Sequence, residues 1–350
     1  MTSSKNDAAD ISSAPSREIH VEKEGTVVLR IESPHQSRRG NRVVMLLLLL
    51  SILLNVWYIG IYPSLYQPPR IPEVHLLGTK GAADRIAVIN FTGTISPPFT
   101  ERWLRQIEKA AEDSSVKGVI LAIDSPGGFV ADSHQIYRQL QTLAEKKPVY
   151  AAMKRIAASG GYYIAMGIGT KGRIFAEPTT WTGSIGVIVP RYNATELASR
   201  IGVKVEPLVT GPLKDTLNPF RDMTAQEQQV WAAIMDDSFQ RFVDVIADNR
   251  EQLGQEQVRS LATGQIYTAS QALQNHMIDQ LGYVEDAAAA LAAKIQLAKW
   301  EAFEYRSTPG LVDAIVGSKA SGSSLADQIL DASVPKAMYY CSWNTWVPAK

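Results

Sequence analysis

The stretch VILAIDSPGGFV, residues 119–130, decides how this chain folds. Residues 119–123 form an apolar run without polar alternation, which predicts a short strand buried on both faces of a sheet. Gly127 and Gly128 follow in a turn, because adjacent glycines permit backbone angles that other residues avoid. From Val130 the apolar residues recur at helical spacing. A buried strand, a turn and a helix in this order form the unit from which parallel sheets are built.

The alternation of strands and helices continues on both sides of this stretch. Apolar runs predict further strands at residues 86–91, 149–153, 174–176, 185–189 and 203–209. Amphipathic spacing predicts helices at residues 99–113, 130–144, 159–166, 194–200, 224–249, 269–274 and 284–297. The pattern predicts an α/β fold with a parallel sheet and flanking helices.

A long apolar segment precedes this domain. Residues 43–62 read VVMLLLLLSILLNVWYIGIY and carry no charge, so a helix of this length would cross the roughly 30 Å hydrocarbon layer of a membrane. A cleaved signal peptide is disfavoured, since residues 1–42 precede the segment and no small-x-small cleavage pattern follows it. Arg38, Arg39 and Arg42 precede the segment, and the positive-inside rule places that end in the cytoplasm. We therefore expect a single-pass protein of the cytoplasmic (inner) membrane, with all later residues on the extracytoplasmic, periplasmic side.

Changes in composition along the chain predict its organisation. The N-terminus is polar and poor in large apolar residues, which is typical of disorder. Prolines after the apolar segment indicate an extended linker. The predicted division is a cytoplasmic disordered tail (1–42), a transmembrane helix (43–62), a linker (63–83), an extracytoplasmic domain (84–300) and a C-terminal extension without assigned structure (301–350).

Charge and cysteine content exclude several classes of protein. The 350 residues include 35 Lys and Arg and 35 Asp and Glu, and zero net charge gives no electrostatic case for nucleic-acid binding. Cys341 is the single cysteine of the sequence, so it cannot form an internal disulfide. A catalytic role for Cys341 is disfavoured because no histidine lies near it in the sequence. We expect no nucleic-acid partner, no metal and no cofactor.

Ser159 is the candidate nucleophile. It follows the predicted strand at residues 149–153 and begins a predicted helix, where unpaired amides and the helix dipole favour negative charge. The amide of Gly160, together with one from the turn at Gly128, could stabilise an oxyanion. Two alternatives stay open at this point, namely an N-cap role for Ser159 and a purely structural turn at Gly127 and Gly128.

Lys214 is the candidate base, chosen mainly by elimination. A Ser–His–Asp triad needs a histidine in reach. His20 and His35 lie in the predicted cytoplasmic tail, His75 lies in the linker, and His134 and His276 lie in predicted helices. A lysine base must be neutral, which requires a pKa about 2–3 units below its usual value near 10.4. A solvated loop lysine remains the alternative for Lys214.

Four ordered motifs give this chain a family resemblance. They are DSPGG at 124–128, ASGGYY at 158–163, TGSIGV at 182–187, and GPLKD followed by NPFRDMT between 211 and 224. The chain resembles signal peptide peptidase A, the membrane-bound serine peptidases of the Clp-protease/crotonase superfamily. The resemblance covers residues 86–290, and it is the combination of motifs that makes it specific, because DSPGG alone fits crotonases or Clp proteases equally well.

The resemblance implies a fold, an activity and a role for each site residue. It implies a Clp-protease/crotonase-like core of repeated β-β-α units and a serine endopeptidase that cleaves remnant signal peptides or other short apolar peptides. Ser159 matches the nucleophile, Lys214 the general base, Gly128 and Gly160 the oxyanion amides, and Ser184 a serine that orients the lysine. It also implies a homo-oligomer of the short, single-module form in which neighbouring subunits complete the site.

Two other functions remain as alternatives, a crotonase-like acyl-CoA enzyme and a catalytically inactive membrane scaffold. The chain departs from the family pattern at Asp124, where many members have Asn, and at Gln265, Ala269, Ser270 and 275–277, none of which touches the proposed dyad. The sequence assigns neither the cleavage preference, nor the physiological substrate, nor the number of subunits, nor a role for residues 1–42 and 301–350.

Overall fold

The computed structural model describes residues 38–66, 71–306 and 338–341, and the chain divides into two units, residues 1–68 and 69–350. The first unit contains one helix, α1 (Arg38–Tyr66). Among the residues whose side chains are described, no helix has both the length and the hydropathy of a membrane span. The predicted tail (1–42) lies almost wholly outside the described residues, as does most of the predicted C-terminal extension.

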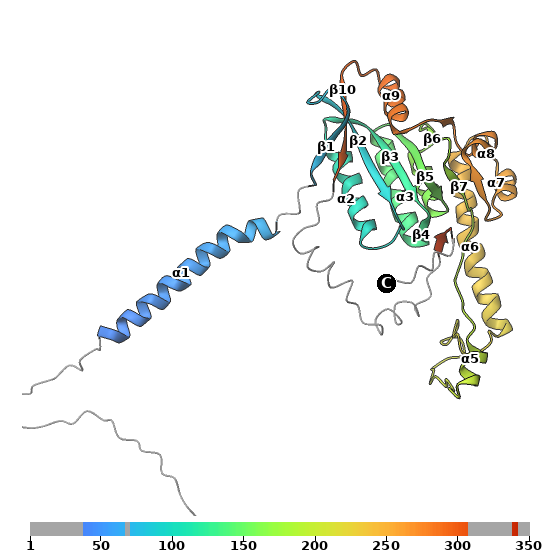
Figure 1. The fold of residues 1–350 in the computed structure, drawn as a ribbon, viewed down its shortest axis with the longest axis horizontal. Helices are drawn as coiled ribbons and strands as arrows, with labels where there is room; N and C mark the ends of the chain where they lie inside the picture. Colours follow the sequence, from blue (N-terminus) through green and yellow to red (C-terminus); the bar gives the residue numbers. More distant parts are fainter. Residues whose placement is uncertain (1–37, 67–70, 307–337, 342–350) are drawn as a thin grey trace, which may run out of the picture. The chain divides into compact units, whose positions relative to one another are not determined.

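The second unit is built around a mostly parallel sheet (Figure 1). Its strands run in the order β1-β10-β2-β3-β5-β6-β9, and off this path the short strand β7 pairs with β5 and the short strand β8 pairs with β7. The pairings β1–β10 and β7–β8 are antiparallel, and the other neighbours in this sheet are parallel. The strands are β1 (Glu73–Gly78), β2 (Asp84–Thr92), β3 (Val116–Ser125), β5 (Val149–Ala158), β6 (Ile174–Ala176), β7 (Trp181–Gly183), β8 (Ile266–Thr268), β9 (Gln280–Leu281) and β10 (Trp300–Tyr305).

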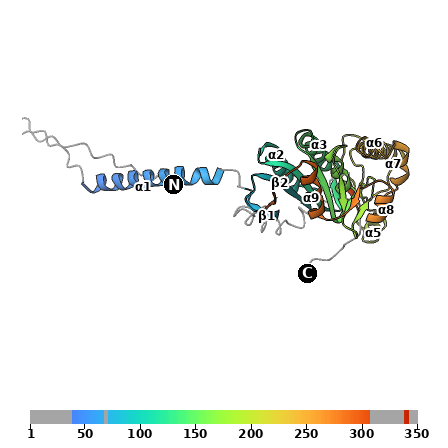
Figure 2. The same ribbon diagram turned by 90° about the horizontal axis from the view of Figure 1, so that it is seen from above.

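Helices cover both faces of this sheet, which confirms the predicted α/β class (Figure 2). Along β3, Val119, Leu121 and Ile123 point into one core with α2, α3 and α6, while Ile120 and Ala122 point into a second core with α9. The apolar run at residues 119–123 lacks polar alternation because both of its faces are buried. The larger helices are α2 (Phe99–Glu112), α3 (Val130–Lys146), α6 (Ala225–Asn249) and α9 (Val284–Lys294).

Short helices and a small second sheet complete this unit. Thr224 caps α6 in the predicted capping box with Glu227. The short helices are α4 (Gly160–Ala165), the 3₁₀ helix η1 (Met166–Ile168), α5 (Thr195–Arg200), α7 (Gln255–Leu261) and α8 (Ala269–Gln274). The second sheet pairs β4 (Gly127–Phe129) with β11 (Met338–Tyr340).

Two of the predicted strands are wrong. Residues 185–189 form no strand, and Ile188 makes only an isolated bridge to Met338. Residues 203–209 have no regular structure and are exposed. Both segments are locally apolar, but an extended segment becomes a strand only when its backbone is paired over several residues. Ile188 pairs with the single residue Met338, and residues 203–209 pair with no described strand.

Several strands lie where the sequence predicts none, and two of them, β1 and β10, change the bounds of the folded unit. β1 falls inside residues 63–83, predicted as a linker, and β10 extends from the predicted domain into the residues predicted as an extension. They pair with each other, Glu73 opposite Tyr305, and β10 continues the sheet next to β2. The folded unit therefore begins before Asp84 and includes residues beyond 300.

Candidate active site

Ser159 sits at a sharp strand-to-helix turn. β5 ends at Ala158, α4 begins at Gly160, and Ser159 between them has φ 55° and ψ −116°. Its amide donates a hydrogen bond to the Gly183 carbonyl at 2.7 Å, and its carbonyl accepts one from the Tyr163 amide at 2.8 Å. A positive φ is rare for a residue with a Cβ and is typical of functional turns, including those that present a nucleophilic serine.

The Ser159 side chain is buried and unpaired. It is 1% exposed, and its Oγ has no hydrogen-bond partner. It makes no capping hydrogen bond to α4, so the alternative N-cap role is wrong. A buried hydroxyl left without a partner costs about 1–3 kcal/mol, which makes a functional reason for Ser159 the simpler explanation.

Gly160 packs backbone against backbone with the turn at Gly127 and Gly128. A Cβ on Gly160 would lie 3.1 Å from the Gly128 nitrogen and 2.6 Å from the Ser133 hydroxyl oxygen. A Cβ on Gly127 would lie 2.7 Å from the Gly160 nitrogen. Both positions therefore require glycine, and the two candidate oxyanion amides belong to segments in direct contact.

The amide of Gly128 points toward β11. On the opposite edge of β4, the Phe129 amide donates to the Ile95 carbonyl at 2.9 Å, and the Ile95 amide donates to the Gly127 carbonyl at 2.8 Å. Successive amides of an extended strand face opposite edges, so the Gly128 amide faces the edge where Tyr339 lies opposite it. In this orientation the Gly128 amide can donate a hydrogen bond to the carbonyl of an extended peptide lying along this edge. The oxyanion role of Gly128 stays a prediction.

Ser184 lies beside Ser159. β7 runs parallel to β5 with Gly183 opposite Ala158, so the two serines follow paired positions. Ser184 is 8% exposed, has φ 50°, and its amide donates to the Gln265 carbonyl at 2.7 Å. The register of β3, β5 and β7 thus brings the ends of these strands together, and with them Ser159, Ser184, Gly128 and Gly160.

Lys214 lies apart from this group within the chain. It is exposed on the segment at residues 190–224, which we call the arm, and the Ser159 hydroxyl makes no hydrogen bond to it. The arm contains α5 and lies at the N-terminal end of α6 (Figure 1). The predicted dyad is therefore not assembled inside the single chain.

An ion-pair network ties the arm to α6. Arg221 binds Asp215, next to Lys214, through Nε at 2.9 Å, and it also binds the buried carboxylate of Glu227 in the first turn of α6. Hydrogen bonds from Arg221 and from the backbone of Thr224 lower the pKa of Glu227 to about 2. The loop that carries Lys214 is therefore fixed to the helix behind it.

His134 contacts Tyr163 and not Ser159. Its Nδ1 lies 2.7 Å from the Tyr163 hydroxyl, and burial together with the charges of Arg241 and Arg138 lowers the pKa of the imidazole. Since the Ser159 hydroxyl is unpaired, His134 forms no triad with Ser159 in this structure. The described residues also contain no cluster of His, Cys, Asp or Glu able to hold a metal ion.

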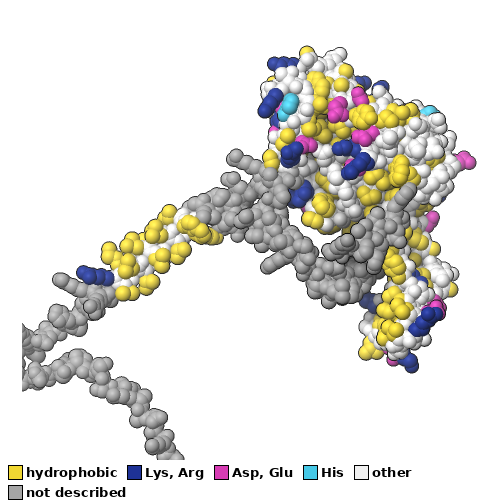
Figure 3. Space-filling model, in the orientation of Figure 1, with side chains coloured by type: hydrophobic (Ala, Val, Ile, Leu, Met, Phe, Trp, Pro, Cys, Tyr) yellow, Lys and Arg dark blue, Asp and Glu magenta, His cyan; other side chains and the backbone are white. Residues whose placement is uncertain are grey.

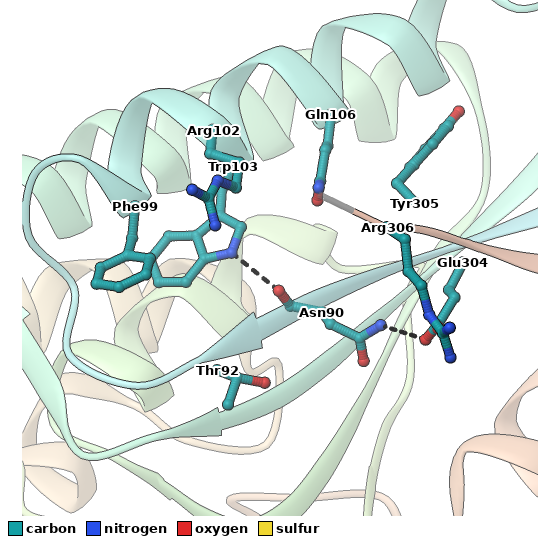
Figure 4. A pocket seen from close by; sticks show the side chains of 9 residues that line it. All are labelled: Asn90, Thr92, Phe99, Arg102, Trp103, Gln106, Glu304, Tyr305 and Arg306. Carbon is teal, nitrogen blue, oxygen red and sulfur yellow. Dashed lines mark hydrogen bonds and ion pairs between the residues drawn. The ribbon is translucent and has the colours of Figure 1, made fainter. Parts of the chain in front are cut away.

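A separate cavity of about 230 Å³ lies between α2, β2 and β10 (Figure 4). Trp103 Nε1 donates to the Asn90 carbonyl at 2.8 Å, and the Asn90 side chain donates to Glu304 at 3.0 Å. None of the candidate catalytic residues lines this cavity. We assign it no part in the chemistry of Ser159.

Sequence reasoning missed the strand at residues 338–340, which pairs with β4 next to Gly128. β11 lies against β4, and Tyr339 packs on Tyr163 and Phe242. The late aromatic residues at 339–340 were a possible signal, but nothing in the local sequence connects them to β4.

Comparison with known proteins identifies the family. Residues 141–298 match the model of peptidase family S49. The protein named "Putative protease slr0021" from Synechocystis sp. is 37% identical over 262 residues, 74% of this chain and 92% of that protein. The "Putative signal peptide peptidase SppA" of Enterococcus faecium is 34% identical over 254 residues, 69% of this chain and 73% of that protein.

Two further matches are more distant. "Protease 4" of Salmonella typhi is 32% identical over 66% of this chain and 37% of its own length. Among solved structures, a ClpP1 mutant from Listeria monocytogenes matches with a TM-score of 0.40 and 16% identity, covering 57% of this chain and 93% of that one. The chain belongs to peptidase family S49. It is a serine protease related to signal peptide peptidase SppA.

Proposed function

We propose that this protein is a membrane-anchored serine endopeptidase with a Ser–Lys dyad, in which Ser159 is the nucleophile and Lys214 the base. The observation that carries the proposal is the buried, unpaired hydroxyl of Ser159 at a strained turn beside the backbone of Gly160 and Gly128. The unit β3–β4–α3 supports a Clp-protease/crotonase-like core of β-β-α repeats.

In this mechanism the neutral amine of Lys214 takes the proton of the Ser159 hydroxyl as its oxygen attacks the peptide carbonyl. The amides of Gly128 and Gly160 donate hydrogen bonds to the oxyanion. The protonated lysine gives its proton to the leaving amine, and a water activated by Lys214 then hydrolyses the acyl ester on Ser159. Ser184 orients the lysine amine.

Lys214 reaches the nucleophile of a neighbouring copy in this proposal. Two observations support it: Lys214 is exposed on the arm, and the arm exposes many large apolar side chains (Figure 3). Exposed apolar surface of this kind marks protein interfaces. The exposed apolar residues of the arm include Tyr192, Leu197, Ile201, Val203, Val205, Leu208, Val209 and Phe220.

The experiment that tests this arrangement mixes two inactive variants. Ser159→Ala and Lys214→Ala should each abolish cleavage of an apolar peptide, while Lys204→Ala, a second exposed arm lysine, should remain active. Dissociating and reassembling the two inactive variants together should restore part of the activity. No recovery would contradict a shared site, and full activity of either single variant would contradict the dyad.

The membrane is the other part of the proposal. The uncharged residues 43–62 lie within α1, and the side chains at residues 43–58 are exposed. An anchored, extracytoplasmic site near a bilayer favours short apolar peptides such as remnant signal peptides. Protease protection of the domain in sealed membrane vesicles would test the topology, and digestion from the cytoplasmic side would contradict it.

Covalent labelling separates this function from the two alternatives. A fluorophosphonate probe should modify Ser159 in the wild type and give no label in Ser159→Ala. A crotonase-like acyl-CoA enzyme would use the Gly128 and Gly160 amides without modification of Ser159, and an inactive scaffold would show neither labelling nor cleavage.

A further inference from the structure

The cavity between α2, β2 and β10 lies at the same edge of the sheet as Ser159. β10, β2, β3 and β5 are parallel, so their carboxyl ends share that edge, at Tyr305, Thr92, Ser125 and Ala158. β2 and β5 are two strands apart, a lateral distance of about 10 Å at the usual strand spacing. Ligands of open α/β sheets bind beyond the carboxyl ends of the strands, and the cavity has such a position.

One loop joins the cavity to the candidate oxyanion turn. Thr92 and Phe99 both line the cavity, and the loop at residues 93–98 connects them. Within this loop, the Ile95 amide donates to the Gly127 carbonyl at 2.8 Å. The cavity is therefore a separate site that lies one loop away from the proposed chemistry.

Gln106 presents an unused hydrogen-bond acceptor to the cavity. Its carboxamide points from α2 into the space between Trp103 and Arg306 (Figure 4). The residue is 3% exposed, and its Oε1 has no hydrogen-bond partner among the described residues. Because buried polar groups of folded proteins are nearly always hydrogen-bonded, this oxygen indicates a ligand that carries an N–H or O–H donor.

Arg102 is a cation without a counter-ion at the wall of the cavity. Its guanidinium lies 5.7 Å from the centroid of the Phe99 ring, and no acidic side chain in the described part of the chain pairs with it. The other charges of the lining offset each other, since Glu304 accepts a hydrogen bond from Arg306 Nε at 2.9 Å. The lining therefore has one uncompensated positive charge, which favours an anionic group on the ligand.

Aromatic side chains form the apolar part of the cavity. The rings of Phe99 and Trp103 stack with centroids 6.0 Å apart, and Tyr305 lies across the cavity from them (Figure 4). The volume of about 230 Å³ is smaller than that of sites for drug-sized ligands, roughly 300–1,000 Å³. The cavity thus has the size for one apolar side chain with its adjoining backbone groups.

We infer that this cavity binds the C-terminal residue of a peptide, with its carboxylate at Arg102, its amide N–H at Gln106 Oε1 and an apolar side chain between the rings. A phosphodiester of a lipid headgroup would supply negative charge but no donor at its phosphate, so the unused acceptor favours a peptide end. The inference rests on the proposed peptidase function and adds a substrate class to it, namely short peptides with a free carboxyl terminus. That terminus is what an earlier proteolytic cleavage leaves.

The test measures peptide binding by isothermal titration calorimetry, with the full chain carrying Ser159→Ala to prevent cleavage. An N-acetylated apolar pentapeptide ending in leucine is compared as the free acid and as the C-terminal amide. The free acid should bind about tenfold more tightly, as expected for a charged hydrogen bond at a half-buried arginine. In this background Arg102→Gln should remove the preference. Arg105→Gln, which changes an exposed arginine of α2 outside the cavity, should retain it.

Gln106→Leu in the same background tests the acceptor. It should weaken binding of the acid and the amide alike, by roughly fivefold each, because both peptides carry the same amide N–H. The melting temperature should not fall, since an apolar group replaces a buried acceptor that had no partner. A lower melting temperature with unchanged affinities would give Gln106 a purely structural role and contradict the site.

The outcomes separate this inference from the function on which it rests. Equal affinity for acid and amide, or a preference that survives Arg102→Gln, overturns the peptide-end site even if the wild type cleaves peptides. Displacement of the free acid by phosphatidylglycerol vesicles, with no effect of Gln106→Leu, would assign the cavity to a headgroup and overturn it as well. Absence of cleavage and of Ser159 labelling in the wild type, with the acid preference intact, overturns the peptidase and leaves the binding site.

Discussion

Ser159 and Ser184 follow paired positions at the ends of two neighbouring parallel strands, and both have a positive φ, 55° and 50°. The Ser159 amide is bonded to the Gly183 carbonyl, directly before Ser184. A shift of β7 by one residue would break this hydrogen bond and turn Ser184 to the other face of the sheet. The backbone register thus fixes which two hydroxyl groups stand beside the site.

Replacing Ser184 by Ala should lower kcat with little change in KM. Loss of a hydrogen bond to the catalytic amine costs about 1.5–3 kcal/mol, which corresponds to roughly 10–100-fold in rate. The neutral lysine would also lose a stabilising partner, so the acid limb of the pH–rate profile should move to higher pH. The control is Ser270→Ala, which removes an exposed hydroxyl on α8. A lower rate without a shift of the acid limb would assign Ser184 a merely structural role.

Gly160→Ala should lower kcat strongly and weaken the fold. The added Cβ would lie 2.6 Å from the Ser133 hydroxyl oxygen and 3.1 Å from the Gly128 nitrogen, so the two candidate oxyanion segments must separate. Overpacking of this kind costs about 1–3 kcal/mol, and a misplaced oxyanion donor costs on the order of 100-fold in kcat.

Gly254→Ala provides the matched comparison for this substitution. Its Cβ would meet only the flexible end of Gln257 within 3.0 Å, so stability and kcat should both remain close to the wild type. Thermal unfolding and kcat are measured for both variants. Wild-type kcat in Gly160→Ala would exclude the predicted role of its amide.

Arg221→Gln should destabilise the arm in a pH-dependent way. Glu227 has a pKa of about 2 in the folded protein against an ordinary value of 4.5, so its ionised form stabilises the fold. That contribution is fully present above pH 4.5 and is lost as the pH falls toward 2. The difference in melting temperature between wild type and Arg221→Gln should therefore be largest near neutral pH and shrink through the acid range. A difference independent of pH would show that Arg221 acts through packing alone.

Disruption of this network should also affect catalysis. Arg221 binds Asp215, the neighbour of Lys214, so the variant should lose peptidase activity at temperatures where α6 and the sheet remain folded. Circular dichroism checks the fold, and the rate of peptide cleavage checks the site. Arg200→Gln, which removes an exposed ion pair on α5, should leave both unchanged.

Local patterns predicted much of the core and the chemistry. The run at residues 119–123 is apolar because β3 is buried on both faces. The start of α6 is marked by a capping box that spans four residues, from Thr224 to Glu227. The turn at Ser159 was predictable because a strand, a serine and two glycines follow one another in the sequence. Such features depend on neighbours a few residues apart, which is the range that sequence periodicity and capping motifs report.

Long-range pairing decided the rest. β1 and β10, and β4 and β11, meet across more than two hundred residues of chain. The apolar segments at residues 185–189 and 203–209 look like strands, but the first makes one isolated bridge, from Ile188 to Met338, and the second pairs with no described strand. Pairing of this kind depends on which edges the folded core leaves open, and local composition does not encode that.

By itself, the sequence determined that a serine peptidase core exists, because its motifs and buried strands are local properties of the chain. Only the tertiary structure decided that the Ser159 hydroxyl is buried and unpaired, that Lys214 stands apart from it on an exposed arm, and that Tyr339 occupies an aromatic pocket on α6. Those three facts depend on how distant segments pack together, since burial, separation and pocket shape are properties of the assembled fold.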